Sequence, residues 1–114
     1  MNIEEYREYC LRKRSTTEGF PFDSNTLVFK IGGKMFALTN LDHFQFVNLK
    51  CNPERSIDLR ETYNGIEPAW HMSKKHWNSV SIHSDVPEQL ILDLIDQSYD
   101  LVVRTLTKKV RGGL

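Results

Sequence analysis

Two consecutive glycines, Gly32 and Gly33, separate two largely apolar runs at residues 27–31 and 34–38. Both glycines can adopt positive φ, so this dipeptide favours a two-residue turn between antiparallel strands. The turn would pair Ile31 with Lys34, Phe29 with Phe36 and Leu27 with Leu38. The core face of the hairpin would then carry Leu27, Phe29, Ile31, Phe36 and Leu38, and the thinner, mixed face Val28, Lys30, Met35 and Ala37. The pattern predicts a half-buried antiparallel sheet.

Local patterns predict the elements on either side of this hairpin. Apolar residues at three- and four-residue steps predict an amphipathic N-terminal helix of about a dozen residues, carrying Ile3, Tyr6, Cys10 and Leu11. Residues 16–25 contain Gly19 and Pro21, which favour a loop. Further strands are expected at residues 44–49 and 76–82, with a turn at Asn64 and Gly65.

Two signatures indicate where later helices begin. Asn52 before Pro53 predicts a short helix that ends at about residue 61. Asp85 as the cap and Glu88 at the capping-box position predict the start of the last helix, which Gly112 would end. Its buried stripe would be Leu90, Ile91, Leu94, Ile95, Leu101 and Val102. The order of elements predicts one α+β domain over residues 1–114, an antiparallel sheet packed against the N- and C-terminal helices.

Charge is balanced overall but unevenly placed. Fifteen basic and fifteen acidic side chains cancel, so the whole chain has no net field to attract phosphate, and nucleic-acid binding would need a local patch. Residues 104–111 carry four cations and no acid, whereas residues 85–100 carry five acids and no Lys or Arg. The basic C-terminal segment is therefore a candidate part of such a patch.

Cysteine content and the absence of long apolar runs indicate the compartment. Cys10 and Cys51 are too few for a disulfide framework and favour buried thiols in a reducing cytosol. Residues 2–14 are charged throughout, unlike a signal peptide, and no apolar run approaches the roughly 20 residues of a membrane span. We expect a soluble cytoplasmic protein with no membrane partner.

The segment at residues 68–77 combines two tryptophans, two histidines and a Lys-Lys pair with no acid. Because paired cations and large aromatics satisfy each other poorly in a core, this composition indicates a presenting surface. Its lysines and histidines could meet phosphates and a tryptophan could stack on a base. The candidate nucleic-acid-binding residues are Trp70, His71, Lys74, Lys75 and His76, joined by Lys108, Lys109 and Arg111 if the last turn lies on the same side. The alternative is that both tryptophans are core, Trp77 packing inward in particular, and the lysines form a solvated turn.

Four segments in this order resemble the MmcQ/YjbR family. They are residues 28–37 (VFKIGGKMFA), 49–54 (LKCNPE), 71–77 (HMSKKHW) and 98–102 (SYDLV). The resemblance implies the α+β fold of the frataxin-like CyaY group and a double-wing DNA-binding-like role, and it implies no catalytic residue. Many relatives have Pro before the terminal Lys-Lys where this chain has Thr107, so the last helix is expected to run further.

Other kinds of site find little support in the sequence. His71 and His76 are five residues apart, which suits neither a helical ligand pair nor one face of a strand, and no metal or cofactor is expected. The N-terminal helix mixes acids and bases and makes a poor iron-binding ridge. Cys10 lies on an apolar stripe and should be an inert thiol. Asp93, Asp96 and Asp100 are expected on a solvated helix face.

These observations favour a non-enzymatic binding module. The leading hypothesis is duplex DNA binding through residues 71–77 and the basic C-terminal segment. The alternative is a protein-interaction or small-ligand domain in which the open face of the sheet receives the partner. An enzyme is the third possibility, for which no catalytic constellation was found.

Overall fold

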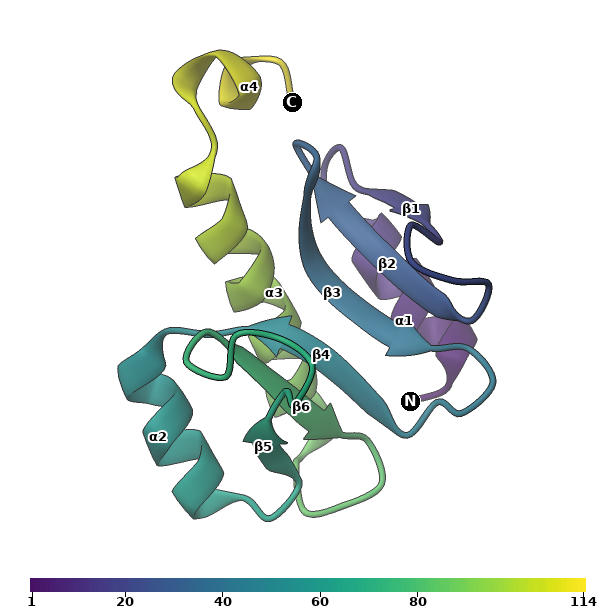
Figure 1. Ribbon diagram of the computed structural model, residues 1–114, viewed down its shortest axis with the longest axis vertical. Coiled ribbons are helices and arrows are strands. Elements are labelled where there is room, and N and C mark those ends of the chain that lie inside the picture. The colour runs from purple at the N-terminus through teal and green to yellow at the C-terminus, as the bar shows by residue number, and fades with distance from the viewer.

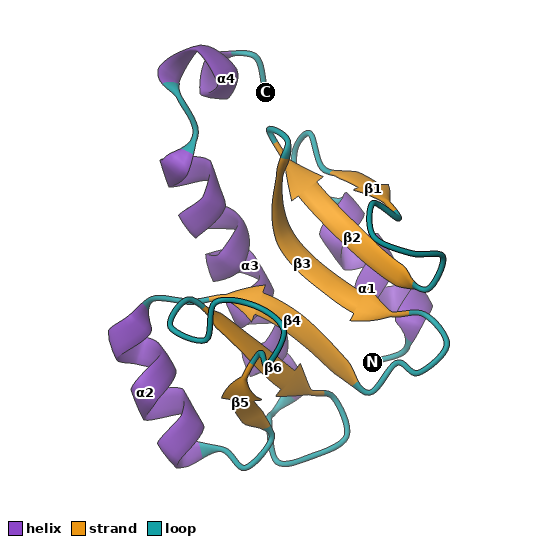
Figure 2. Ribbon diagram, viewed as in Figure 1, coloured by secondary structure: helices purple, strands orange, loops and turns teal.

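The computed structural model describes residues 1–114 as a six-stranded antiparallel sheet with helices packed on one face (Figures 1 and 2). The predicted α+β class is confirmed, with the sheet order β1-β2-β3-β4-β6-β5. The helices α1 and α3 lie behind the sheet in the view of Figure 1, and α2 lies beside β5 and β6. The elements are α1 (Ile3–Leu11), β1 (Thr17–Gly19), β2 (Thr26–Ile31), β3 (Lys34–Asn40), β4 (Phe46–Lys50), α2 (Pro53–Thr62), β5 (Ile66–Pro68), β6 (Trp77–Ser81), α3 (Glu88–Thr105) and α4 (Lys108–Gly112).

The β2–β3 hairpin turn is confirmed, but its predicted register is wrong beyond the first residues. Gly32 and Gly33 have φ of 59° and 81°, and Ile31 pairs with Lys34. The register then shifts by one residue at a β-bulge, so that β2 and β3 pair as Phe29 with Ala37, Val28 with Leu38 and Leu27 with Thr39. The predicted Phe29–Phe36 and Leu27–Leu38 pairs therefore do not form.

The bulge redistributes side chains between the two faces of β3. Phe36 and Ala37 both join the core, and the rings of Phe29 and Phe36 lie 6.4 Å apart, so these phenylalanines share the predicted core face. Leu38, predicted in the core, instead lies on the open face of the sheet, the face opposite α1 and α3. The buried hydroxyl of Ser98 on α3 donates to the Phe36 carbonyl and accepts from the amide of Lys50, 2.8 Å away. This serine therefore satisfies backbone groups of β3 and β4 at the bulge.

The helix starts are only partly as predicted. Asn52 caps α2 with Pro53 at the first helical position, which confirms that prediction. The predicted Asp85 cap is wrong, because α3 begins after Pro87 without a side-chain cap. The Asp85 carboxylate accepts instead from the backbone amides of Asn64 and Gly65, at 2.8 Å each. It ties the turn before β5 to the segment that leads into α3.

Two further expectations are corrected. The predicted loop at residues 16–25 contains the three-residue edge strand β1, where Glu18 accepts two hydrogen bonds from Arg7 of α1. The last helix does not run on, because Leu106 is extended and Thr107 caps the separate helix α4. Leu106 and Val110 pack on the β2–β3 turn, where a Cβ on Gly32 would meet Leu106 at 2.7 Å. Packing against the hairpin therefore accompanies the break in the helix.

The core lies between the helices and the sheet. Tyr6, Phe29, Phe36 and Ile95 are fully buried, and Tyr6 meets Phe29 edge to face with ring centroids 5.6 Å apart. The open face carries no such cover. None of the helices is both long enough and apolar enough to cross a membrane.

Candidate ligand-binding groove on the open sheet face

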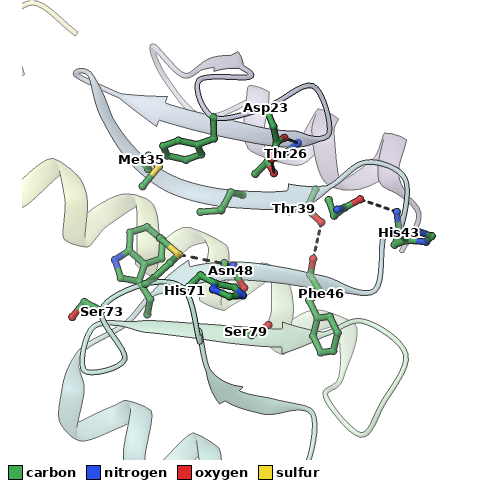
Figure 3. A pocket seen from close by; sticks show the side chains of 15 residues that line it. Asp23, Thr26, Met35, Thr39, His43, Phe46, Asn48, His71, Ser73 and Ser79 are labelled. Atoms are coloured by element: carbon green, nitrogen blue, oxygen red, sulfur yellow. Dashed lines mark hydrogen bonds between the residues drawn. The ribbon is translucent and has the colours of Figure 1, made fainter.

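A groove of about 750 Å³ lies on the open face of the sheet (Figure 3). In Figure 3, Met35 and Thr26 lie on one side of it, and Asn48, His71 and Ser79 on the other. Its apolar lining is Phe22, Met35, Leu38, Phe46, Met72 and Trp77. Its polar lining is Asp23, Thr26, Thr39, Asn40, His43, Asn48, His71, Ser73 and Ser79.

Cross-strand pairing builds the floor of the groove. Leu38 on β3 pairs with Asn48 on β4, which pairs with Ser79 on β6, so these side chains form one row across three strands. Trp77 lies opposite Lys50 in register, and Phe46 is four residues from Lys50 along β4. At the usual rise of a strand, Trp77 and Phe46 therefore stand about 13 Å apart along the sheet, on either side of that row.

Several polar side chains of the groove have no partner within the protein. His71, Ser73 and Ser79 make no side-chain hydrogen bond, and the only contact of the Asn48 amide is a long one, 3.9 Å from Nδ2 to Met72 Sδ. These groups are free to bind a ligand in place of water. Asp23 differs, because the backbone amides of Asn25 and Thr26 donate to its carboxylate and hold its pKa below the usual range.

Residues 69–76, here called the Trp70 loop, bring His71, Met72 and Ser73 to the groove. Arg60 of α2 holds this loop from beneath. Its Nη2 donates to the Lys74 carbonyl at 2.5 Å, and its Nε donates to Oδ1 of the buried Asn78 at 2.8 Å. Asn78 Nδ2 in turn donates to Ser56 Oγ at 3.1 Å. The Arg60 guanidinium therefore connects the loop that forms one wall of the groove to α2 and β6 through charged hydrogen bonds.

The Trp70 loop is exposed, as a presenting surface requires. Trp70 is 61% exposed, and Lys74 Nζ lies 4.5 Å from its ring centroid in a cation–π contact. Lys75 and His76 are exposed beside them. Trp77 is half-buried and lines the groove, so the alternative in which both tryptophans belong to the core is wrong.

The C-terminal candidates lie elsewhere. Lys108, Lys109 and Arg111 are exposed on α4, which packs beside the β2–β3 turn at the top of Figure 1. The Trp70 loop lies between β5 and β6 in the lower half of that view. The candidate residues therefore form two separate basic surfaces.

The other side chains considered in the sequence do not assemble a reactive centre. No group of three or more His, Cys, Asp or Glu side chains comes together as a possible metal site. Burial raises the pKa of the Cys10 thiol to about 12. Asp93 and Asp100 are exposed, as expected of a solvated helix face, whereas Asp96 is only partly exposed, accepts from the Tyr9 hydroxyl at 2.7 Å and pairs with Lys13.

Sequence reasoning missed the groove floor. Asn48 and Ser79 are 31 positions apart in the printed sequence and become neighbours only through the β4–β6 pairing. The one available signal was the mixed outer face of the hairpin, where Met35 was already placed. The composition of that face indicated that it is open, but it did not indicate which residues of β4 and β6 lie next to the hairpin.

Comparisons with known proteins support the resemblance noted in the sequence. The YjbR family model matches residues 11–101. The uncharacterized protein YbdF of Escherichia coli O157:H7 is 44% identical over 91 residues, covering 79% of this chain and 75% of that protein. The uncharacterized protein YyaQ of Bacillus subtilis is 37% identical over 99 residues, covering 86% and 79% of the two chains.

Solved structures agree with the fold. The crystal structure of Deinococcus radiodurans protein DR2400, described as a DUF419 domain, superposes with a TM-score of 0.92 at 36% identity, covering 98% of this chain and 86% of that one. A crystal structure of a Pseudomonas syringae protein gives a TM-score of 0.74 at 29% identity, covering 89% and 98% of the two chains. None of these descriptions assigns an activity.

Proposed function

The chain belongs to the YjbR family, and from this premise we propose that it is a non-enzymatic binding module whose ligand occupies the groove on the open sheet face. The observation that carries the proposal is the lining of the groove. Apolar side chains such as Trp77 and Met35 surround polar side chains of Asn48, His71 and Ser79 that make no short hydrogen bond within the chain. A ligand site combines apolar contact with a few orienting polar groups in this way.

The chemistry of the lining supports a binding role over catalysis. The groove contains no Cys, Lys or Glu, and its one carboxylate, on Asp23, is engaged by the backbone of its own turn. His43 and His71 have no hydrogen-bonded nucleophile or orienting partner among the side chains. Acyl transfer would need an activated nucleophile beside a base, and glycoside hydrolysis would need a pair of carboxylates.

A groove-filling variant tests the proposal. Ser79→Phe places a ring on the floor of the groove, and Thr62→Phe places the same ring on the exposed end of α2 as the control. The probes are benzamide, indole, benzimidazole and adenosine, screened by NMR against the parent protein. We expect probes that bind the parent to bind Thr62→Phe equally and to lose at least about tenfold in affinity with Ser79→Phe, because the ring occupies their site. Equal binding to both variants, or no binding by any probe, would contradict the proposal.

Duplex DNA is the second candidate ligand, through the Trp70 loop. The observation that favours it is the exposure of Trp70, Lys74, Lys75 and His76 on one loop without an acid. Lysines there would meet phosphates and the exposed indole would wedge at a groove edge, in keeping with the double-wing DNA-binding-like resemblance. The cations of α4 would have to reach a separate stretch of DNA.

Binding isotherms on a mixed-sequence duplex at two salt concentrations test this candidate. Changing Lys74 and Lys75 together to Ala should weaken binding and lower the salt slope by about 0.9 for each phosphate that the variant no longer neutralises. Changing Arg12 and Arg14, which lie on the helix side of the molecule, should leave the slope unchanged. An unaltered slope in the folded double-lysine variant would exclude the Trp70 loop as a phosphate-binding surface.

We also propose that the protein is cytoplasmic. Cys10 and Cys51 are buried free thiols, which is the usual state of cysteine in a reducing compartment. Cell fractionation tests this placement, and recovery of the protein outside the cytoplasmic fraction would contradict it.

A further inference from the structure

Starting from the proposed groove site, we infer that its occupant is a single-stranded nucleic acid, whose bases stack on Phe46 and Trp77 and whose phosphates meet Lys30 and Lys50. The recognised chemistry is an unpaired base joined to a phosphate backbone, which both single-stranded DNA and RNA offer. Three features of the open face lead to this ligand class: its aromatic side chains, its lysines and the free Asn48 amide.

Large aromatic side chains line the groove or lie on the loop beside it in exposed positions. Phe46 is 45% exposed on β4, Phe22 is 64% exposed in the loop between β1 and β2, and Trp70 is 61% exposed in the Trp70 loop. With the half-buried Trp77, they offer ring faces that no side chain of the core covers. Every base has a π-face, so platforms of this kind bind single strands with little regard to sequence.

Phe46 and Trp77 stand about 13 Å apart on the sheet, as the four-residue interval along β4 requires. The value is the spacing of the two residues along the strand direction. It suits separate bases along an extended strand, each stacked on one ring. The geometry therefore favours a chain of bases over a single small aromatic ligand.

Two lysines lie on the same face of the sheet as the exposed aromatic rings. Lys50 lies opposite Trp77 in register on the neighbouring strand, and Lys30 lies on the same face at β2, beside a second pocket of about 300 Å³. Neither lysine takes part in an ion pair within the protein. Both lysines lie outside the lining of the groove, on the open face at its Trp77 end, where they can meet the phosphates of a strand that leaves the groove at that end. An apolar peptide segment would gain nothing from two uncompensated cations at its binding face.

Asn48 supplies a group that can pair with base edges. It lies in the central row between Phe46 and Trp77, and its carboxamide has both a donor and an acceptor free of short hydrogen bonds. A duplex conceals both the faces and the pairing edges of its bases. The groove should therefore discriminate against duplex, in contrast to Trp70, Lys74, Lys75 and His76, which lie outside its lining.

The test uses fluorescein-labelled thymidine and uridine oligonucleotides of about 12 nucleotides, with a duplex of the same length, at low salt. We expect one or both single strands to bind at least about tenfold more tightly than the duplex, because only they offer free base faces. The thymidine and uridine arms show whether DNA or RNA is preferred. In the Trp70→Phe protein, where Trp77 is the only indole, the bound single strand should quench the tryptophan fluorescence by stacking. Duplex binding equal to or tighter than single-strand binding would overturn the inference.

Two pairs of variants locate the contact. Phe46→Ala should weaken single-strand binding about five- to a hundredfold, whereas Ile57→Ala, a similarly exposed apolar residue on α2, should change nothing. Lys50→Gln should lower the salt slope by about 0.7, and Lys109→Gln on α4 should leave it unchanged. Equal effects within each pair would overturn the inference. If benzamide or adenosine binds in the groove but neither oligonucleotide binds, the inference fails while the proposed groove site stands; if no probe binds, both fail.

Discussion

Phe36 stands at the residue where β3 changes register, with its side chain in the core and its carbonyl satisfied by Ser98. Phe36→Ala should lower the free energy of unfolding by about 3–5 kcal/mol, because it removes a fully buried ring and leaves a cavity. Phe22→Ala is the matched control, since that ring is 64% exposed and should matter by no more than about 0.5 kcal/mol. Urea denaturation measures both, and similar values would refute the core assignment of Phe36.

Asp85 makes stability depend on pH in acid. Hydrogen bonds from the backbone amides of Asn64 and Gly65 lower the pKa of its carboxyl in the folded protein. A lowered folded-state pKa contributes stability that is present above the unfolded-state value of about 3.9 and is lost as pH falls through the folded-state value. Asp85→Asn should therefore flatten the decline of melting temperature below about pH 4.

Asp100→Asn serves as the control for this titration, because Asp100 is exposed and makes no hydrogen bond or ion pair. Its acid profile should resemble that of the parent. A decline in Asp85→Asn as steep as in the parent would mean that the two backbone hydrogen bonds do not couple folding to this carboxyl.

The only part of the candidate site that could be predicted from the sequence was the part revealed by local amino-acid composition. Two tryptophans beside a Lys-Lys pair indicated an exposed surface, and Trp70 and Lys74 are indeed exposed. The role of Trp77 as a groove wall, and the row that contains Asn48 and Ser79, depend on which strands pair. Single-residue properties do not encode that pairing.

At the scale of elements, Arg60 joins α2 to the Trp70 loop. Arg60→Met should cost about 1–3 kcal/mol, because the Asn78 side chain and the Lys74 carbonyl lose a charged donor. Arg55→Met on the same helix is the control, since Arg55 makes no hydrogen bond or ion pair. Hydrogen exchange should also become faster at residues 69–76 in Arg60→Met alone. Unchanged exchange there would show that the loop is held by other interactions.

The elements themselves were largely predictable, whereas their junctions were not. The Gly-Gly turn determines only the first pairs of the β2–β3 hairpin, and the bulge that follows involves Ser98 from a distant helix. The break at Leu106 likewise accompanies packing on Gly32. The strand β1 has only three residues, too few for a periodic signal. The bulge and the helix break involve contacts between residues far apart in the sequence, which a local pattern does not reveal.

At the scale of the whole molecule, the protein should gain no stability from a metal ion. A ligand that binds only the native state raises its melting temperature by mass action. We therefore expect the same melting temperature with and without near-stoichiometric zinc, since no cluster of ligating side chains is assembled. A reproducible rise that disappears in His71→Ala or His76→Ala would contradict this prediction.

The whole molecule presents one covered and one open face of a single sheet, with helices on the first and the groove on the second. The most direct test of the open face as the binding surface is an amide-resolved NMR titration of the full chain with benzimidazole and adenosine. The account predicts that the largest shifts fall on Asn48, Ser79, Met35 and the Trp77 indole N–H, with α2 and α4 little changed. Shifts concentrated on α2 or α4, with the groove unaffected, would contradict it.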